Sequence, residues 1–173
     1  MIGICEVIAM NLHIVGRNSD LQKDPNRILI DMLKSRWNQN GADDDQELKV
    51  MDGNNNNGVR FSDDWFNESS WYQVIVKHIN TQVKSITLGA RGYIEYNSYH
   101  AIHIFTKGKN ARDKIWKLEK EIERIIATNT TNMSEGIQLV LLQDFKTIPV
   151  EDAYEDVEHS IMTVMLRYYK TTA

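Results

Sequence analysis

Histidine, cysteine and acidic side chains are the residues of this chain that could build a metal or catalytic site. The sequence holds five histidines and one cysteine among 173 residues. His100 and His103 lie three positions apart on a predicted strand, so their side chains face opposite sides and cannot bind one metal ion together. His13, His78 and His159 are isolated in apolar segments, which is typical of packed or hydrogen-bonded histidines. The histidine pattern therefore predicts no metal site.

A calcium-loop pattern is present in part. Asp52, Asn54 and Asn56 occupy positions 1, 3 and 5 of an EF-hand-like sequence, and Asp63 stands at position 12. Position 6, where such a loop needs glycine, is Asn57, and no helix is predicted on either side. We interpret the segment as a flexible, asparagine-rich loop.

Signs of catalysis and of cofactor binding are lacking in the sequence. Cys5 has no histidine or basic neighbour that would stabilise its thiolate, and it is interpreted as a small buried hydrophobic residue. No serine stands in a G-x-S-x-G elbow, and Gly108 precedes a helix without the other glycines of a phosphate-binding fingerprint. We therefore expect no enzymatic activity and no cofactor.

Two clusters of like charge are candidates for partner contacts. Basic residues surround the start of a predicted helix, where positive charge opposes the helix dipole, and this placement favours contact with an acidic surface or with phosphates. The candidate residues are Lys109, Arg112, Lys114 and Lys117. A long polar loop at 41–70 carries the acidic residues Asp43, Asp44, Asp45, Asp63 and Asp64. The alternative for both clusters is an ordinary solvated surface.

Length and composition bound the class of protein. With 42% hydrophobic and 25% charged residues, the chain is expected to form a globular domain. A net charge of -4 argues against a protein whose main task is to bind nucleic acid or an anionic membrane. The apolar N-terminus lacks the features of a signal peptide and is too short to span a bilayer. We expect an arm at 1–23, a single domain at 24–173, and a soluble protein that is intracellular or assembled from the cytoplasm.

The elements that would position these residues follow from periodicity and turn signals. Helices are predicted at 24–38, where Asp24 caps and Pro25 starts the helix, and at 109–128, which has a single apolar stripe. Strands are predicted at 71–79, 86–96, 100–106, 137–145 and 159–169, with short pieces at 48–51 and 59–61. The polar residues 97–99 predict a hairpin turn, and Gly89 and Gly92 predict a bulge or a close backbone approach. The expected fold is α+β, a two-layer, mostly antiparallel sheet of four to five strands with two main helices packed on one face.

The order of elements resembles that of the tail terminator (tail completion) proteins of tailed bacterial and archaeal viruses. The resemblance rests on the helix D-P-x-x-I-L-I-x-x-L at 24–33, on the strand at 100–106 that leads directly into the helix at 110–126, and on an acidic stretch before the final strand at 159–169. It covers most of the chain from 24 to 169. The N-terminal arm and the asparagine-rich insertion depart from a minimal member of this family.

The resemblance implies a structural function in the virion. Such proteins form a hexameric ring that caps the tail tube, ends its polymerisation and joins it to neck or connector proteins, after assembly in the host cytoplasm. The acidic loop would then contact a neighbouring subunit, and the basic cluster would contact an acidic neighbour or line a channel for passing DNA; no membrane partner is implied. Two alternatives stay open: another head-tail connector or head-completion protein, and a small ligand-binding or enzymatic α+β domain.

Overall fold

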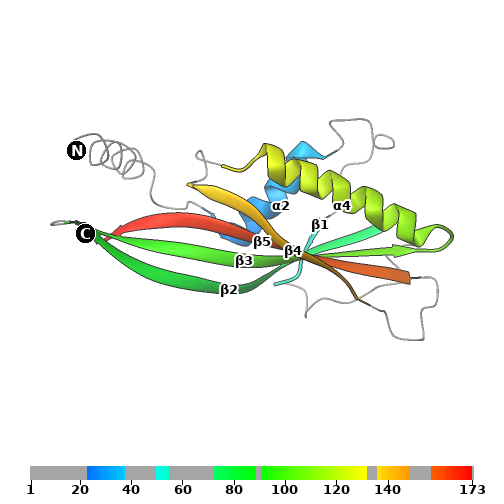
Figure 1. Cartoon of the computed structure of the whole chain (residues 1–173), viewed down its shortest axis with the longest axis horizontal. Coiled ribbons are helices and arrows are strands. Elements are labelled where there is room, and N and C mark those ends of the chain that lie inside the picture. The colour runs from blue at the N-terminus through cyan, green and yellow to red at the C-terminus, as the bar shows by residue number, and fades with distance from the viewer. Residues whose placement is uncertain are drawn as a thin grey trace, which may run out of the picture.

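The computed structural model describes residues 23–37, 50–54, 72–88, 91–131, 136–148 and 157–172. They form two helices and an open sheet of five strands, which is mixed α/β and mostly antiparallel as predicted (Figure 1). In chain order the elements are α2 (Pro25–Arg36), β1 (Val50–Asp52), β2 (Tyr72–Leu88), β3 (Arg91–Lys107), α4 (Ala111–Thr128), β4 (Leu139–Ile148) and β5 (Val157–Thr172). The strand order is β1-β2-β3-β5-β4, and only the β1–β2 pair is parallel.

Both helices begin where the local sequence predicts. The side chain of Asp24 accepts a hydrogen bond from the backbone N–H of Asn26 at 3.2 Å, and Pro25 opens α2. Helix α4 follows β3 after a short turn in which Gly108 and Asn110 have φ angles of 84° and 66°. The turn reverses the chain because glycine and asparagine tolerate this left-handed conformation.

The predicted hairpin turn at 97–99 is wrong. Strand β3 runs without a break through these residues, and residues 86–88 belong to β2, so the chain reverses between Leu88 and Arg91. Because β3 lies between β2 and β5, the polar side chains of Asn97 and Ser98 find partners on neighbouring strands. Polar residues that resemble a turn in sequence are thus tolerated in the middle of a strand.

The bulge also lies elsewhere than predicted. Gly92 pairs in regular register with Thr172, and Gly89 lies outside the described residues. The register of the hairpin shifts instead between His78 and Asn80, which leaves Ile79 as the extra residue of β2. A bulge of one residue changes which side chains share a face of the sheet.

One large core joins both helices to the sheet. It contains the apolar stripe of α4, the inward residues of α2, and alternate residues of β2, β3 and β5, among them Val74, Val76, Ile102, Ile104, Met162 and Val164. Alternate residues of a strand share one face, so this face of the sheet supplies the core. A smaller cluster contains Ile75, Phe105 and Val157 from the alternate positions.

Past Leu139, the first residue of β4, which pairs with Arg167, the sheet continues as a ribbon of three strands. Residues 72–76 of β2 are all buried, whereas residues 79–85 are all exposed. Strand β3 pairs with β2 and β5 along this whole length, and Figure 1 shows the three strands running past the helices toward the C-terminus. We call β2 from 79, β3 up to 99 and β5 from 165 the distal ribbon; its base pairs with β4 at 165–167 and supplies Leu166 and Tyr168 to the core.

Candidate functional site

The outer face of α4 carries most of the predicted basic cluster. Lys109 lies in the turn before the helix, and Arg112 and Lys117 lie on the helix; all three are exposed. Lys114 is partly buried, and its Nζ donates to the backbone oxygen of Lys107 at 3.1 Å, so its charge holds the end of β3. The structure therefore brings Lys109, Arg112 and Lys117 to the same end of α4, while the role of these residues in binding stays a prediction.

Trp116 belongs to the same surface and was missed by the sequence analysis. Its side chain is 60% exposed, although tryptophan is usually well buried in a folded chain. At 100° per residue it lies between Arg112 and Lys120 on the side opposite the buried stripe. The available signal was a tryptophan on the polar face of a strongly amphipathic helix. Tryptophan and arginine are the residues most enriched at the centres of protein interfaces.

The predicted acidic loop lies outside the described residues. This applies to Asp43, Asp44, Asp45, Asp63 and Asp64, to the short strand at 59–61, and to almost all of the N-terminal arm with Cys5. Asp52, the first residue of the calcium-like pattern, is described. Its Oδ1 accepts hydrogen bonds from Asn26 Nδ2 at 2.7 Å and from Asn54 N at 3.0 Å, so it joins β1 to α2.

A buried chain of polar groups begins at Asp52 and runs through Asn26 and His100. Asn26 Nδ2 donates to Asp52 and, at 3.3 Å, to the backbone oxygen of Val76, and both partners can only accept. Asn26 Oδ1 therefore accepts from His100 Nδ1 at 2.9 Å. The second nitrogen of His100, Nε2, then carries no proton and accepts from Ser98 Oγ at 2.9 Å. The amide of Asn26 thus fixes the tautomer of His100.

The same chain of hydrogen bonds reaches the surface of the distal ribbon. Ser98 Oγ accepts from Thr81 Oγ1 at 3.3 Å, so Thr81 Oγ1 accepts from His78 Nε2 at 2.8 Å. The bulge at Ile79 makes this possible, since residues 78 and 81 would face opposite sides of a regular strand. We call these six residues, Asp52, Asn26, His100, Ser98, Thr81 and His78, the polar relay.

The hydrogen bonds of the polar relay run in the same direction as those of a catalytic serine and its histidine base. The burial of these residues nevertheless favours a structural role. Ser98 points its proton at His100, which is oriented by Asn26, as in a serine–histidine–amide arrangement. However, Ser98 is 1% exposed and His100 is 0% exposed, so a substrate could not reach the hydroxyl without opening the sheet. Burial, with a smaller effect of nearby His78, lowers the pKa of His100 to about 3, and the ring is neutral at pH 7. The relay therefore ties α2 and β1 to the base of the distal ribbon.

Two further histidines lie on the other face of the sheet, as expected from the spacing of His100 and His103. His103 Nδ1 and His159 Nε2 share a hydrogen bond of 3.1 Å, and His159 stacks on Phe105 with ring centroids 4.0 Å apart. Burial lowers the pKa of each histidine to about 4, and for His103 the neighbouring His159 and Lys77 add to the effect. This pair is packed and neutral near pH 7.

The distal ribbon has a polar face and an aromatic face. On the polar face Arg167 Nε donates to Asn97 Oδ1 at 2.9 Å, and Tyr169 OH donates to Glu95 Oε2 at 2.9 Å. Burial alone would raise the pKa of Glu95, but the hydrogen bonds from Asn97 and Tyr169 and the charge of Arg167 outweigh it, and the pKa lies below its usual value. These contacts between β3 and β5 keep the ribbon in one register.

Aromatic stacking stiffens the opposite face of the ribbon. Tyr96 and Tyr168 stack with ring centroids 5.0 Å apart and planes 2° from parallel. Lys170 Nζ lies 5.3 Å from the centre of the Tyr96 ring, within the range of a cation–π contact. Tyr168 belongs to the core and Tyr96 packs against it, so this pair anchors the ribbon to the core while the polar face stays outside it.

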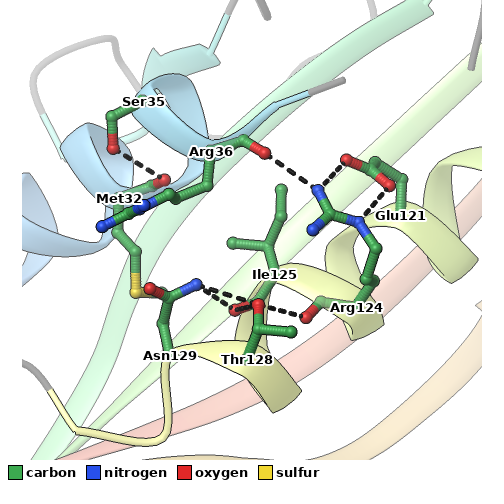
Figure 2. Close-up of polar contacts among 8 residues, drawn as sticks. All are labelled: Met32, Ser35, Arg36, Glu121, Arg124, Ile125, Thr128 and Asn129. Atoms are coloured by element: carbon green, nitrogen blue, oxygen red, sulfur yellow. Dashed lines mark hydrogen bonds and ion pairs between the residues drawn. The ribbon is translucent and has the colours of Figure 1, made fainter. Parts of the chain in front are cut away.

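A second set of polar contacts fixes α4 against α2 (Figure 2). Arg124 donates to both oxygens of Glu121 and, through Nη2 at 2.9 Å, to the backbone oxygen of Arg36 at the end of α2. The Arg36 oxygen would otherwise be one of the unpaired carbonyls at a helix end. Near the end of α4, Asn129 Nδ2 donates to Ile125 O at 2.7 Å. The two helix ends are thus locked together, which sets the direction of the outer face of α4.

Comparisons with known proteins add no family to this description. No helix in the described ranges is both long and apolar enough to cross a membrane. Within the same ranges no three histidine, cysteine or acidic side chains gather in a way that could hold a metal ion. No model of a known protein family matches the sequence, and no curated protein is similar enough to match it.

Proposed function

We propose that this chain is a structural virion protein, a tail terminator whose hexameric ring caps the tail tube and joins it to neck or connector proteins. The proposal combines the resemblance in element order with the surfaces of the described residues. Its site of action is the virion tail, and its partners are further copies of itself, the tail tube protein and the neck.

The observation that carries the proposal is the distal ribbon. A strand that is fully buried at 72–76 continues into seven consecutive exposed residues at 79–85. The ribbon is nevertheless held in register by the contacts of Glu95, Arg167 and the Tyr96–Tyr168 stack. An ordered projection of this length gains little for the stability of a monomer, whereas it extends the surface available to a neighbouring subunit.

The proposed ring has a two-layer subunit with α2 and α4 on one face of the sheet. This arrangement is supported by the shared core of both helices with Val76, Ile102 and Met162. It directs the outer face of α4 away from the sheet. Lys109, Arg112, Trp116 and Lys117 then face a partner, which in this proposal is an acidic surface of the tube or neck, with passing DNA as a further non-specific contact.

The test is to incubate the purified protein with tail tubes from the matching particle and to image the products by electron microscopy. Sixfold rings at tube ends support the proposal. Bare tubes beside rings that bind the portal side of the neck would instead identify a head-tail connector. Bare tubes and no binding to either structure would refute a function at this junction.

A further inference from the structure

The sheet ends in two unlike edges. Strand β1 pairs with β2 only at Val74–Val76, and no described strand pairs with the outer edge of β2 from 79 to 88. Strand β4 forms the opposite edge, where the backbone N–H of Val140 donates to Thr130 O at 2.7 Å and no described strand follows. Among the described residues, β2 from 79 and β4 after Val140 therefore offer backbone donors and acceptors to another strand.

Large apolar side chains are exposed on both edges. Four such residues are exposed in the described part of the chain, and three of them lie on these strands: Ile79 at 53% and Val83 at 60% on β2, and Leu141 at 43% on β4. Long edges with exposed apolar residues attract further strands unless a partner covers them. Because one edge occurs on each side of the sheet, a second copy of the chain can cover both.

We propose that residues 80–84 of β2 in one copy pair antiparallel with residues 144–148 of β4 in the next copy, in a head-to-tail contact. This inference rests on the proposed ring and names the surface that forms it. In the sheet β2 and β4 run in opposite directions, so a neighbour that continues the sheet with its strands in the same sense brings them together antiparallel. Head-to-tail contacts of this kind form a ring when the rotation between neighbours closes.

Charge selects the register of the pair. Lys84 is the only charged residue of the free part of β2, and Asp144 is the only acidic residue of β4. Placing Lys84 opposite Asp144 also places Thr81 opposite Thr147, and all four side chains are exposed. A shift of two residues would place Lys84 opposite Lys146, and cross-strand pairs of like charge are destabilising.

The faces of the two strands agree with this register. Lys84 is paired with Glu95 of β3 and Asp144 with Thr163 of β5, and the register of β3 with β5 puts Glu95 and Thr163 on the same face of the sheet. A shift by one residue would turn every side chain to the wrong face. The proposed pair therefore continues the sheet without reversing it.

The stagger between the edges suits a closed ring. Asp144 pairs with Thr163, Thr163 with Ala101 and Ala101 with Lys77, so Asp144 and Lys77 lie at the same level of one sheet. Lys84 pairs with Glu95, which is six residues from Ala101 along β3. Within one copy, Lys84 and Asp144 are therefore offset by six ladder steps. Six steps correspond to about 20 Å along the strands, and the four strand spacings of one repeat to about 19 Å across them. The ratio of these two distances corresponds to strands tilted by about 45° from the ring axis, which is near the tilt at which sheets close into barrels.

Disulfide cross-linking tests the contact directly. In a Cys5→Ser background, the double variant Lys84→Cys/Asp144→Cys should form covalent species larger than dimers on oxidation, because opposite Cβ atoms lie about 4.5–5.5 Å apart. Each single-cysteine variant should give dimers at most. The edge pairing would be overturned if light scattering detected oligomers of the double variant that did not cross-link beyond the dimer. It would also be overturned if the wild-type chain stayed monomeric at every concentration and on tail tubes.

A charge variant provides a second test that adds no cysteine. Asp144→Lys should weaken self-association about threefold or more at each contact, whereas Lys146→Gln, which lies opposite uncharged Gln82, should leave it unchanged. Equal association of both variants would contradict the register. Cross-linked rings that leave tail tubes bare would refute the terminator proposal alone, and capped tubes without the Lys84–Asp144 cross-link would refute the edge pairing alone.

Discussion

Substitution of Asn26 by alanine should destabilise the fold by removing a buried set of hydrogen bonds. Asn26 is 0% exposed and makes three side-chain hydrogen bonds, to His100, Asp52 and Val76. Its removal leaves the buried Nδ1–H of His100 without an acceptor, which costs about 1–3 kcal/mol. Loss of the bond to the Asp52 carboxylate costs about 1.5 kcal/mol, the low end for a charged acceptor, since Asp52 is partly exposed and keeps its bond from Asn54.

Alanine has a higher helix propensity than asparagine, and this offsets about 0.5 kcal/mol of the lost unfolding free energy. We therefore expect Asn26→Ala to lower the free energy of unfolding by about 3 kcal/mol and Tm by about 6–12 °C. The assay is urea unfolding at pH 7, followed by circular dichroism. Ser35→Ala serves as the matched control on α2, because Ser35 is exposed and its hydroxyl donates only a local hydrogen bond to Met32 O at 3.2 Å.

A double-mutant cycle makes this prediction specific to the polar relay. If Asn26 acts through His100, the effects of Asn26→Ala and His100→Ala should be less than additive by about 1 kcal/mol or more. A structural role for the Asn26–His100 bond is refuted if the free energy of unfolding of Asn26→Ala lies within about 0.5 kcal/mol of the wild-type value, or if the effects of the two substitutions are additive.

Four further outcomes are expected. Because the folded pKa of His100 is about 3, against an ordinary 6.5, the unfolded chain binds more protons between these values. Stability should be full well above pH 6.5, and the contribution of His100 should fall by about 1.2 kcal/mol from pH 6 to 5; a flat urea-unfolding profile would contradict this. Nitrogen-15 NMR at pH 7 should find the proton of His100 on Nδ1, and a proton on Nε2 would reverse the relay. Arg124→Ala should cost about 2 kcal/mol by removing the ion pair of buried Glu121, and Glu121→Ala in the same chain should recover part of that loss. Trp116→Ala should change Tm by less than about 2 °C yet weaken tube binding at least about tenfold, with Glu123→Ala as the neutral control.

Local chemistry predicted both helices and most strands. Asp24 and Pro25 define the start of α2, and the apolar stripe defines the buried side of α4, because caps and periodicity act within one or two turns. The mostly antiparallel sheet followed from the same reasoning. The basic end of α4 was also found from sequence, since it needs only neighbouring residues.

Contacts between distant residues decided the rest. Residues 97–99 resemble a turn, but Asn97 is held by Arg167 and Ser98 by His100, which in turn is held by Asn26, 74 positions away. The sequence shows two separate polar residues at 26 and 100, and only the pairing of β3 between β2 and β5 brings them together.

What the sequence determined by itself is therefore the set of elements and the faces that they bury, because these depend on spacing along the chain. The tertiary structure decided the length of the hairpin, the bulge at Ile79, the polar relay and the two unlike edges of the sheet. These features depend on which strands are neighbours, and a buried polar group is stable only where a distant partner satisfies its hydrogen bonds.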